Sequence, residues 1–170
     1  RTCFGKASTF VLDFENTEVC AMITDGEEAG LRGCKSWAKN HYDEYVNSGV
    51  ETVVLCVDTL TDREYLRVYN KDMTGTVKNN QQFSQLVMDA SKDAGHDDIE
   101  LSSVFFGSSD AAAFSQAGIT ATCLAAMDPR PADYYHNRRD TADRLVPETI
   151  KTGFDVIIST ILNFDEKGLN

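Results

Sequence analysis

Two adjacent glutamates, Glu27 and Glu28, follow the apolar run of residues 19–23 and precede an amphipathic segment. Neighbouring side chains on a turn point in different directions. One carboxylate can therefore hold a metal ion while the other takes a proton from metal-bound water. A Glu-Glu pair is also common at the solvated start of a helix, where the helix dipole favours acidic side chains. The pair indicates metal-assisted acid–base chemistry only if further ligands converge on it.

Segments that favour strands and helices alternate along the chain. Apolar or β-branched runs predict strands, and apolar residues at helical spacing predict helices. The expected strands cover residues 9–14, 19–24, 51–57, 65–69, 103–106 and 119–126, and the expected helices cover 31–45, 80–93, 110–116 and a segment that starts at 147. The first two strands are compatible with a hairpin. The alternation predicts an α/β fold with three layers, helix/sheet/helix, and a mostly parallel central sheet.

The last helix has the clearest helical pattern. It begins at Pro147, a favoured first helical position. Its apolar residues recur at helical spacing and form one stripe: Ile150, Phe154, Ile157, Ile158, Ile161 and Leu162. With 170 residues and 42% hydrophobic composition, the chain is expected to form a single domain over residues 1–170.

Polar residues that could bind a metal follow the later strands. Asp58 comes after an expected strand, Asp110 begins the short helix, and His136 lies in the long polar loop after the last strand. Ligands of open α/β sheets bind beyond the carboxyl ends of the strands, so we expect these side chains and the two glutamates to share one rim. Each has a simpler reading as a turn cap, a helix cap or a solvated loop residue. Together, carboxylate and imidazole ligands suit zinc or a similar divalent ion.

Composition excludes some classes of partner. The net charge is −11 and there is no basic run, which argues against nucleic acid and anionic membrane surfaces. There is also no apolar run long enough to span a bilayer and no leader segment. The cysteines are odd in number and not closely paired: Cys3, Cys20, Cys34, Cys56 and Cys123. Because three of them lie in apolar runs, we expect reduced thiols and a cytoplasmic protein, with secretion left open.

Four stretches resemble, in the same order, the co-catalytic zinc exopeptidases of the bacterial leucyl aminopeptidase type. This family is related to glutamate carboxypeptidase and glutaminyl cyclase. The stretches are TDGEEAGLRGCKSWAKNH at 24–41, VVLCVDTLTD at 53–62, FGSSDAAAFSQAGITATCL at 106–124 and YYHNRRDTADRL at 134–145. The resemblance implies a metallopeptidase that removes N-terminal residues from a peptide substrate with one or two zinc ions.

The resemblance also implies a role for each matching residue. Glu27 is the general base, Glu28 and His136 hold the first metal, and Asp58 holds the second. Asp110 and Asp140 orient ligands and loops around them. Tyr135 is a candidate for binding substrate or an oxyanion, as is Tyr134, with packing as the alternative for both.

One departure from the family puts activity in doubt. Family members carry a His-x-Asp segment and a bridging aspartate upstream of the glutamate pair, but here only 26 residues precede Glu27 and none is histidine. We therefore expect an N-terminally incomplete domain that is a poor enzyme alone. A piece of a longer enzyme is the favoured origin; the others are a second copy that completes the site and a degenerate, non-catalytic binding or scaffold relative.

Two further expectations follow from the missing ligands. A glutaminyl cyclase-like acyltransferase that uses one zinc ion is an alternative function. An exposed sheet edge also favours a homo-oligomer that covers it. The segment His96-Asp97-Asp98 contains another His-x-Asp pattern, but we expect it in a solvated loop at the opposite edge of the sheet.

Overall fold

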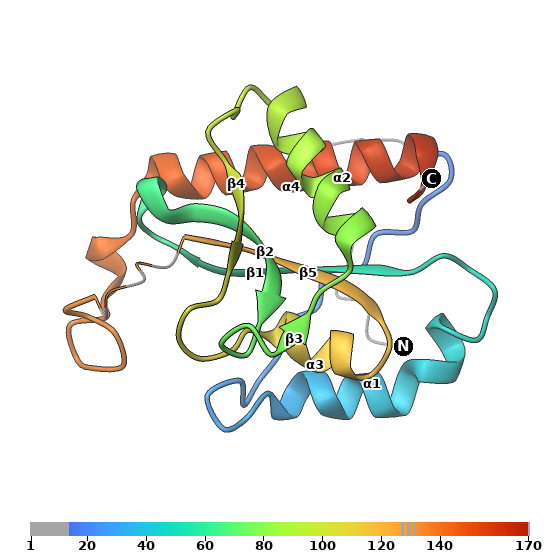
Figure 1. Ribbon diagram of the computed structural model, residues 1–170, viewed down its shortest axis with the longest axis horizontal. Coiled ribbons are helices and arrows are strands. Elements are labelled where there is room, and N and C mark those ends of the chain that lie inside the picture. The colour runs from blue at the N-terminus through green and yellow to red at the C-terminus, as the bar shows by residue number, and fades with distance from the viewer. Residues whose placement is uncertain (1–13, 127, 129, 131, 170) are drawn as a thin grey trace.

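The computed structural model describes residues 14–126, 128, 130 and 132–169, and in this part of the chain a sheet lies between two pairs of helices (Figure 1). The strands are β1 (Val53–Leu60), β2 (Leu66–Asp72), β3 (Val77–Lys78), β4 (Glu100–Ser103) and β5 (Thr120–Ala126). The helices are α1 (Arg32–Tyr45), α2 (Gln81–Asp93), α3 (Asp110–Gln116) and α4 (Pro147–Lys167), with short 3-10 turns at Arg63–Tyr65 and Ala142–Arg144. The expected three-layer α/β fold is confirmed.

Each face of the sheet has its own apolar core. On one face α1 and α3 pack against the sheet through buried residues such as Cys34, Ala38, Phe114 and Cys123. On the other face α2 and α4 cover a second cluster that includes Leu66, Phe83, Val87, Leu124 and Val156. Burial of both faces explains why β5 is apolar almost throughout.

The sheet is mixed, which corrects the expectation of a mostly parallel one. Its strand order is β1-β5-β2-β3, and β4 pairs with β2. β1 and β5 are parallel, as are β2 and β4, but β2 runs antiparallel to both β5 and β3. The link between β1 and β2, residues 61–65, is too short for the crossover that a parallel connection needs. The chain therefore turns back, and β2 and β4 end at the opposite edge from β1 and β5.

Local caps explain where the helices begin. The Asn80 side chain accepts a hydrogen bond from the Phe83 backbone N–H and caps α2. Ser109 caps α3 in the same way by accepting from the Ala111 N–H. Three consecutive buried alanines, residues 111–113, then let α3 lie close to the sheet. The structure confirms the predicted bounds of α3, while β4 begins three residues before the expected strand at 103–106.

The final helix buries a different face from the one its apolar stripe suggested. The residues of α4 that are buried are Thr149, Thr152, Gly153, Val156 and Thr160. Three members of the predicted stripe, Ile150, Phe154 and Leu162, are instead exposed by 38%, 59% and 43%. Small residues face the sheet because the helix lies close to β1: a Cβ at Gly153 would stand 2.6 Å from Leu60 Cδ1.

The strand expected at residues 19–24 is absent from the structure. This stretch is irregular, Ile23 is 95% exposed, and Cys20 is exposed rather than buried in a strand. A strand needs a hydrogen-bonded neighbour, and the stretch has no ladder partner among the described residues. Of the first expected strand, residues 9–13 lie outside the described residues, as does Cys3. Residues 15 and 16 lie against the C-terminal part of α4. Their backbone N–H groups donate to the Asp165 carboxylate over 3.0 and 2.8 Å.

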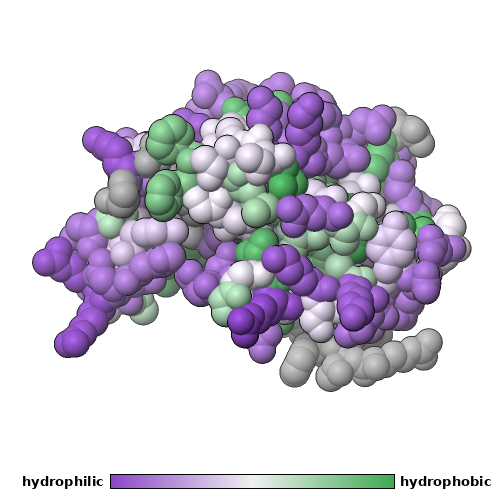
Figure 2. Space-filling view, turned by 60° about the horizontal axis from the view of Figure 1, so that its bottom comes forward, coloured by the Kyte–Doolittle hydropathy of each residue, from purple (hydrophilic) through white to green (hydrophobic). Residues whose placement is uncertain are grey.

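Several apolar side chains remain at the surface. Figure 2 shows apolar residues scattered across the middle of one face, with hydrophilic residues along its border. Over the described surface as a whole, the exposed large apolar side chains include Val19, Ile23, Val57, Phe105 and Phe106. Exposed apolar surface of this kind is a common site of association, and the expected homo-oligomer stays a prediction. Within the described residues, none of the helices combines the length and the apolar character that crossing a bilayer needs.

Candidate active site

The glutamate pair lies in a tight turn before α1 rather than in the helix itself. The Gly30 and Leu31 N–H groups donate to the Glu27 carbonyl over 2.9 and 2.8 Å, and the Gly33 N–H donates to the Asp25 carbonyl over 3.0 Å. Gly30 has φ +97°, a conformation that favours glycine. The first turn of α1 contains no acidic residue, so the reading of the pair as a solvated helix start does not apply.

A close backbone contact at Gly33 fixes this turn. A Cβ there would stand 2.5 Å from the Asp25 carbonyl oxygen and 2.9 Å from its nitrogen. We expect Gly33→Ala to lower the free energy of unfolding by about 1–3 kcal/mol, because rigid backbone must move, and to displace the glutamates. Urea unfolding measures this loss. Gly153→Ala is the matched comparison, since its new Cβ meets the flexible end of Leu60, and an equal loss in both variants would contradict the prediction.

A bulge in β1 places Asp58. The strand continues to Leu60, but its register with β5 shifts between Asp58 and Leu60, and Thr59 has φ +44°. Bulges of this kind redirect a side chain. The Thr59 hydroxyl donates to Asp58 Oδ1 over 2.9 Å. The carboxylate of Asp58 therefore leaves the strand as a half-buried, hydrogen-bonded group near its end.

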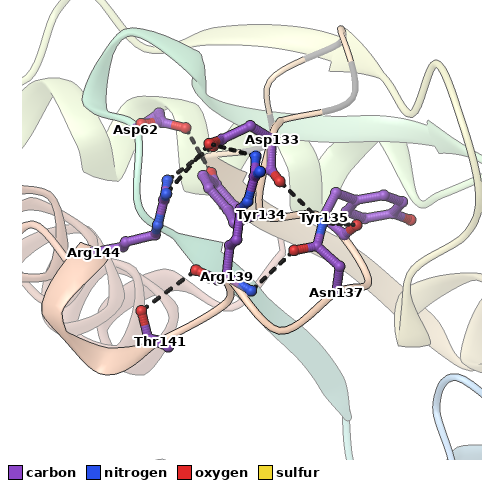
Figure 3. Close-up of polar contacts among 8 residues, drawn as sticks. All are labelled: Asp62, Asp133, Tyr134, Tyr135, Asn137, Arg139, Thr141 and Arg144. Carbon is purple, nitrogen blue, oxygen red and sulfur yellow. Dashed lines mark hydrogen bonds and ion pairs between the residues drawn. The ribbon is translucent and has the colours of Figure 1, made fainter.

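The loop after β5 brings His136 to the glutamate turn. His136 Nε2 lies 3.0 Å from the Glu28 carboxylate, and both side chains are more than half exposed. The loop and the turn before α1 lie at the same end of the molecule (Figure 1). The Tyr135 ring stacks on the imidazole with a centroid distance of 3.8 Å (Figure 3 shows Tyr135 among the residues that shape the loop). Two segments that are far apart in the chain thus meet through side chains of metal-binding type.

Asp110 reaches the same region by another route. β4 ends at the edge away from the ends of β1 and β5, and the loop of residues 104–109 leads back over the sheet to α3. The buried Asp72 carboxylate anchors this loop by accepting hydrogen bonds from the Ser109 N–H and hydroxyl. Asp110 then accepts a 2.6 Å hydrogen bond from the Thr24 hydroxyl, which lies just before the glutamate turn.

Glu27 is the group whose ionisation the site changes most clearly. Its pKa is raised from 4.5 to about 7, mainly by burial and then by the nearby carboxylates of Glu28, Asp58 and Asp110, while His136 lowers it. Burial, with a smaller effect from the Glu28 carboxylate, also raises the pKa of Tyr135. Burial raises the pKa of the Cys34 thiol to about 12, with Asp110 beside it. A carboxyl group that titrates near neutral pH suits a general base.

This pKa predicts a pH dependence of stability. The folded chain keeps the Glu27 proton up to a pH of about 7, whereas the unfolded chain loses it near 4.5. The contribution of the protonated Glu27 carboxyl group to the stability of the fold is therefore complete below pH 4.5. It is lost as the pH rises to about 7. We expect the urea midpoint of the zinc-free chain to fall over this range, and to fall less in Glu27→Gln. If the urea midpoint falls equally in Glu27→Gln and in the exposed control Glu18→Gln, the raised pKa of Glu27 is contradicted.

Comparison with known proteins gives the family. The model of peptidase family M28 matches residues 8–161. The chain belongs to peptidase family M28. The resemblance to co-catalytic zinc exopeptidases is thereby confirmed. No curated protein matches the chain.

Solved structures share the fold of this M28 chain. The LapA aminopeptidase of Legionella pneumophila is 17% identical with a TM-score of 0.68, over 83% of this chain and 38% of that chain. A glutaminyl cyclase from an Acidobacteriales bacterium is 17% identical with a TM-score of 0.63, over 81% and 47%. BSAP, a zinc aminopeptidase from Bacillus subtilis, is 20% identical with a TM-score of 0.59, over 79% and 33%. The chain spans less than half the length of each of these proteins.

One residue of the predicted M28 site is not brought to it, and one residue expected outside the site lies at an unexpected edge of the sheet. Asp140 is exposed, and the described part of the chain offers its carboxylate no hydrogen-bond donor; its predicted orienting role stays a prediction. His96 lies before β4, whose start pairs with the start of β2 and hence lies at the edge where β5 ends. Its expected place at the opposite edge is therefore wrong, but its Nε2 lies 3.5 Å from Asp155 of α4, away from the glutamate turn.

The donor types of the M28 chain fit zinc, but the residues that the structure describes supply too few of them. Glu28 and His136 are in contact and could share one ion, and Asp58 could serve a second. A catalytic zinc normally has three protein ligands. Among the residues that the structure describes, no group of three or more histidine, cysteine or acidic side chains could hold a metal. The predicted roles of Glu27, Glu28, Asp58 and His136 stay predictions.

Sequence reasoning missed three residues that shape this site. Asp72 anchors the loop before α3, Thr24 donates to Asp110, and Asp62 accepts a 2.7 Å hydrogen bond from Tyr134. Asp72 and Asp62 end or follow strands, as metal ligands do, so position alone could not separate them from Asp58. What distinguishes them is a hydrogen-bond partner distant in the chain.

Proposed function

We propose that this M28 chain supplies part of the catalytic centre of a zinc-dependent aminopeptidase, which hydrolyses the N-terminal peptide bond of a peptide. The 3.0 Å contact between His136 Nε2 and the Glu28 carboxylate, with Glu27 beside it, carries the proposal. Family membership and the zinc aminopeptidase among the similar folds support the same chemistry. Glu28 and His136 are far apart in the sequence, so a chance contact between their side chains is a poor explanation.

Each residue has a defined task in this proposal. Glu28 and His136 would hold one zinc ion, and Asp58 would contribute to a second. A metal held there would supply polarisation of the scissile carbonyl and a lower pKa of water. Glu27 takes a proton from the attacking water and delivers it to the leaving amine, for which a pKa near 7 is suited because the group must both accept and release the proton.

Two other features would orient the peptide. The Tyr135 ring stacks on His136, and its hydroxyl lies 3.7 Å from where a Cβ of Gly107 would stand, so the phenol lines the space between the loop and the residues before α3. We assign it to the substrate carbonyl. The carboxylates around Glu27 attract the free ammonium group at the substrate N-terminus, in keeping with the net charge of −11.

Zinc content and amino-acid release test this function together. The purified chain, incubated with zinc and dialysed, is expected to retain the metal and to release amino acid slowly from an aminoacyl anilide. A chelator should stop the release and added zinc should restore it. Slow turnover is expected because the described residues supply an incomplete ligand set.

Other outcomes separate the alternatives. Cyclisation of peptides with N-terminal glutamine, with release of ammonia but no hydrolysis, would indicate an acyltransferase of the glutaminyl cyclase type instead. A folded chain that takes up no zinc would overturn the proposal and favour a non-catalytic binding relative. Circular dichroism recorded with and without zinc distinguishes that result from unfolding.

A further inference from the structure

The loop that carries His136 is fastened to the residues just after β1. We propose that Tyr134 and Asp62 are positioning residues, which hold His136 against Glu28 through a hydrogen bond between them. The inference deepens the proposed function and rests on it, because it concerns the same imidazole. Neither residue touches the reacting atoms.

The bond between these two residues joins distant segments. The Tyr134 hydroxyl donates to Asp62 Oδ2 over 2.7 Å, and both side chains are partly buried (Figure 3). Asp62 lies four positions after Asp58, on the short link between β1 and β2. The bond therefore ties the His136 loop to the same end of the sheet that presents Asp58.

One other bond reaches outside the loop: the exposed Arg130 guanidinium, six positions before His136, donates to the Tyr65 hydroxyl over 2.7 Å. The bonds around His136 itself are local and set the shape of the loop rather than its place. The Asn137 side-chain amide donates to the Asp133 and Tyr135 carbonyls over 2.9 and 3.1 Å. These contacts support the turn in which His136 adopts φ +55°, an unfavourable conformation for a residue with a Cβ. Such a turn could keep its shape while the whole loop moved away from Glu28.

Two alternatives for holding the loop are weaker. The His136–Glu28 contact is itself exposed, with side chains 53% and 71% accessible, and exposed pairs contribute little. Arg144 pairs with Asp133 over 2.8 and 3.2 Å and lies 5.5 Å from the centre of the Tyr134 ring. That pair joins two parts of the same loop and does not reach the sheet (Figure 3).

The same contacts give the two adjacent tyrosines different roles. The Tyr134 hydroxyl is engaged by Asp62, so it is not available to a substrate. The Tyr135 ring instead stacks on His136, with the ring centroids 3.8 Å apart. Tyr134 is thus assigned to positioning, and Tyr135 keeps the role at the substrate.

The first test needs no zinc. Tyr134→Phe removes one hydroxyl and keeps the ring under Arg144. The chain has three histidines, so the imidazole resonances of His136 are readily assigned with a His136→Gln variant. In zinc-free Tyr134→Phe we expect the His136 resonances to move toward those of an unstructured histidine, with His41 and His96 unchanged. Tryptic cleavage after the exposed Arg138 and Arg139 should become about tenfold faster, the factor typical of one lost hydrogen bond to a charged group.

A second test measures zinc affinity by competition with a chromophoric chelator. Loss of a group that orients a ligand typically weakens metal binding by about 10- to 100-fold, and we expect the lower value for Tyr134→Phe. Asp62→Ala should match it, whereas Asp62→Asn keeps an acceptor oxygen and should retain most of the affinity. The double variant Tyr134→Phe/Asp62→Ala should be no weaker than either single one, because both remove the same bond. Tyr42→Phe, on α1, is the matched control.

The outcomes decide between positioning and simple packing. Unchanged His136 resonances and cleavage in Tyr134→Phe would overturn the inference. Faster cleavage with unchanged His136 resonances would also overturn it, since the loop would then be fastened without holding the imidazole. If the wild-type chain takes up no zinc, the proposed function fails while the zinc-free resonances still decide this inference. If Tyr134→Phe does not fold, the contrast between Asp62→Asn and Asp62→Ala decides it.

Discussion

Glu27→Gln is expected to lower the turnover number for amino-acid release by about 10²–10⁴-fold, the usual contribution of a general base. Glutamine has the same shape but cannot take a proton from water. Because Glu28 and His136 are untouched, bound zinc should stay at the wild-type level. The measurement is kcat with an aminoacyl anilide under saturating zinc, together with the zinc content of the same sample.

The matched control for this prediction is Glu18→Gln. Glu18 is an exposed glutamate outside the turn, and its replacement changes the net charge by the same amount. We expect turnover in Glu18→Gln to stay within about twofold, because an exposed charge outside the site is screened by solvent. If Glu27→Gln keeps turnover close to wild type, Glu27 is not the base. If it loses zinc as well as turnover, Glu27 is a ligand and the assignment of the two adjacent glutamates is wrong.

Local signals predicted most elements of the fold. The bounds of α3 and α2 follow from local signals, since caps and left-handed glycines such as Gly118 and Gly95 act within a few residues. The cap of α3 is nevertheless Ser109 rather than Asp110, which the sequence had offered as a helix cap. Buried strands such as β5 are visible as apolar runs because both faces are covered. These features depend on neighbours in the sequence.

Features that depend on distant partners were not predicted. Residues 19–24 have strand-like composition, but composition cannot show whether a neighbouring strand exists. The direction of β2 depends on how the chain turns after Leu60, and assuming parallel strands misplaced the His96 loop. In α4, hydrophobic spacing identified the stripe with Ile150 and Phe154, but close approach to Leu60 requires small residues, so Gly153 and its neighbours face the sheet.

In the candidate site, too, some features could be predicted from the sequence, whereas others depend on distant partners. The expectation that ligands gather at one rim of the sheet agrees with the contact between His136 and Glu28. It also covers Asp58, which lies near the end of β1, a strand parallel to β5. It reached Asp110 for the wrong reason, because β4 runs the other way and Asp72 anchors the returning loop. Hydrogen bonds such as Tyr134–Asp62 depend on the rotamers of two distant side chains, which no sequence pattern specifies.

Removing either proposed ligand of the first metal is expected to weaken zinc binding by more than about 100-fold, which exceeds the effect of groups that only orient a ligand. The variants are His136→Ala and Glu28→Gln, and each leaves a single donor where two stood 3.0 Å apart. Chelator competition on the folded chain measures the dissociation constant. Both side chains are exposed, so neither substitution should lower the free energy of unfolding appreciably.

Shared use of one ion makes a stricter prediction than loss of affinity. If Glu28 and His136 bind the same zinc, the double variant should be little weaker than either single variant, since the first substitution already removes the site. His41→Ala, in an exposed histidine of α1 that contacts Glu44, removes an imidazole from elsewhere on the surface and should leave affinity unchanged. Losses that add in the double variant would mean two independent weak sites, and the contact between Glu28 and His136 would then be an ordinary surface ion pair.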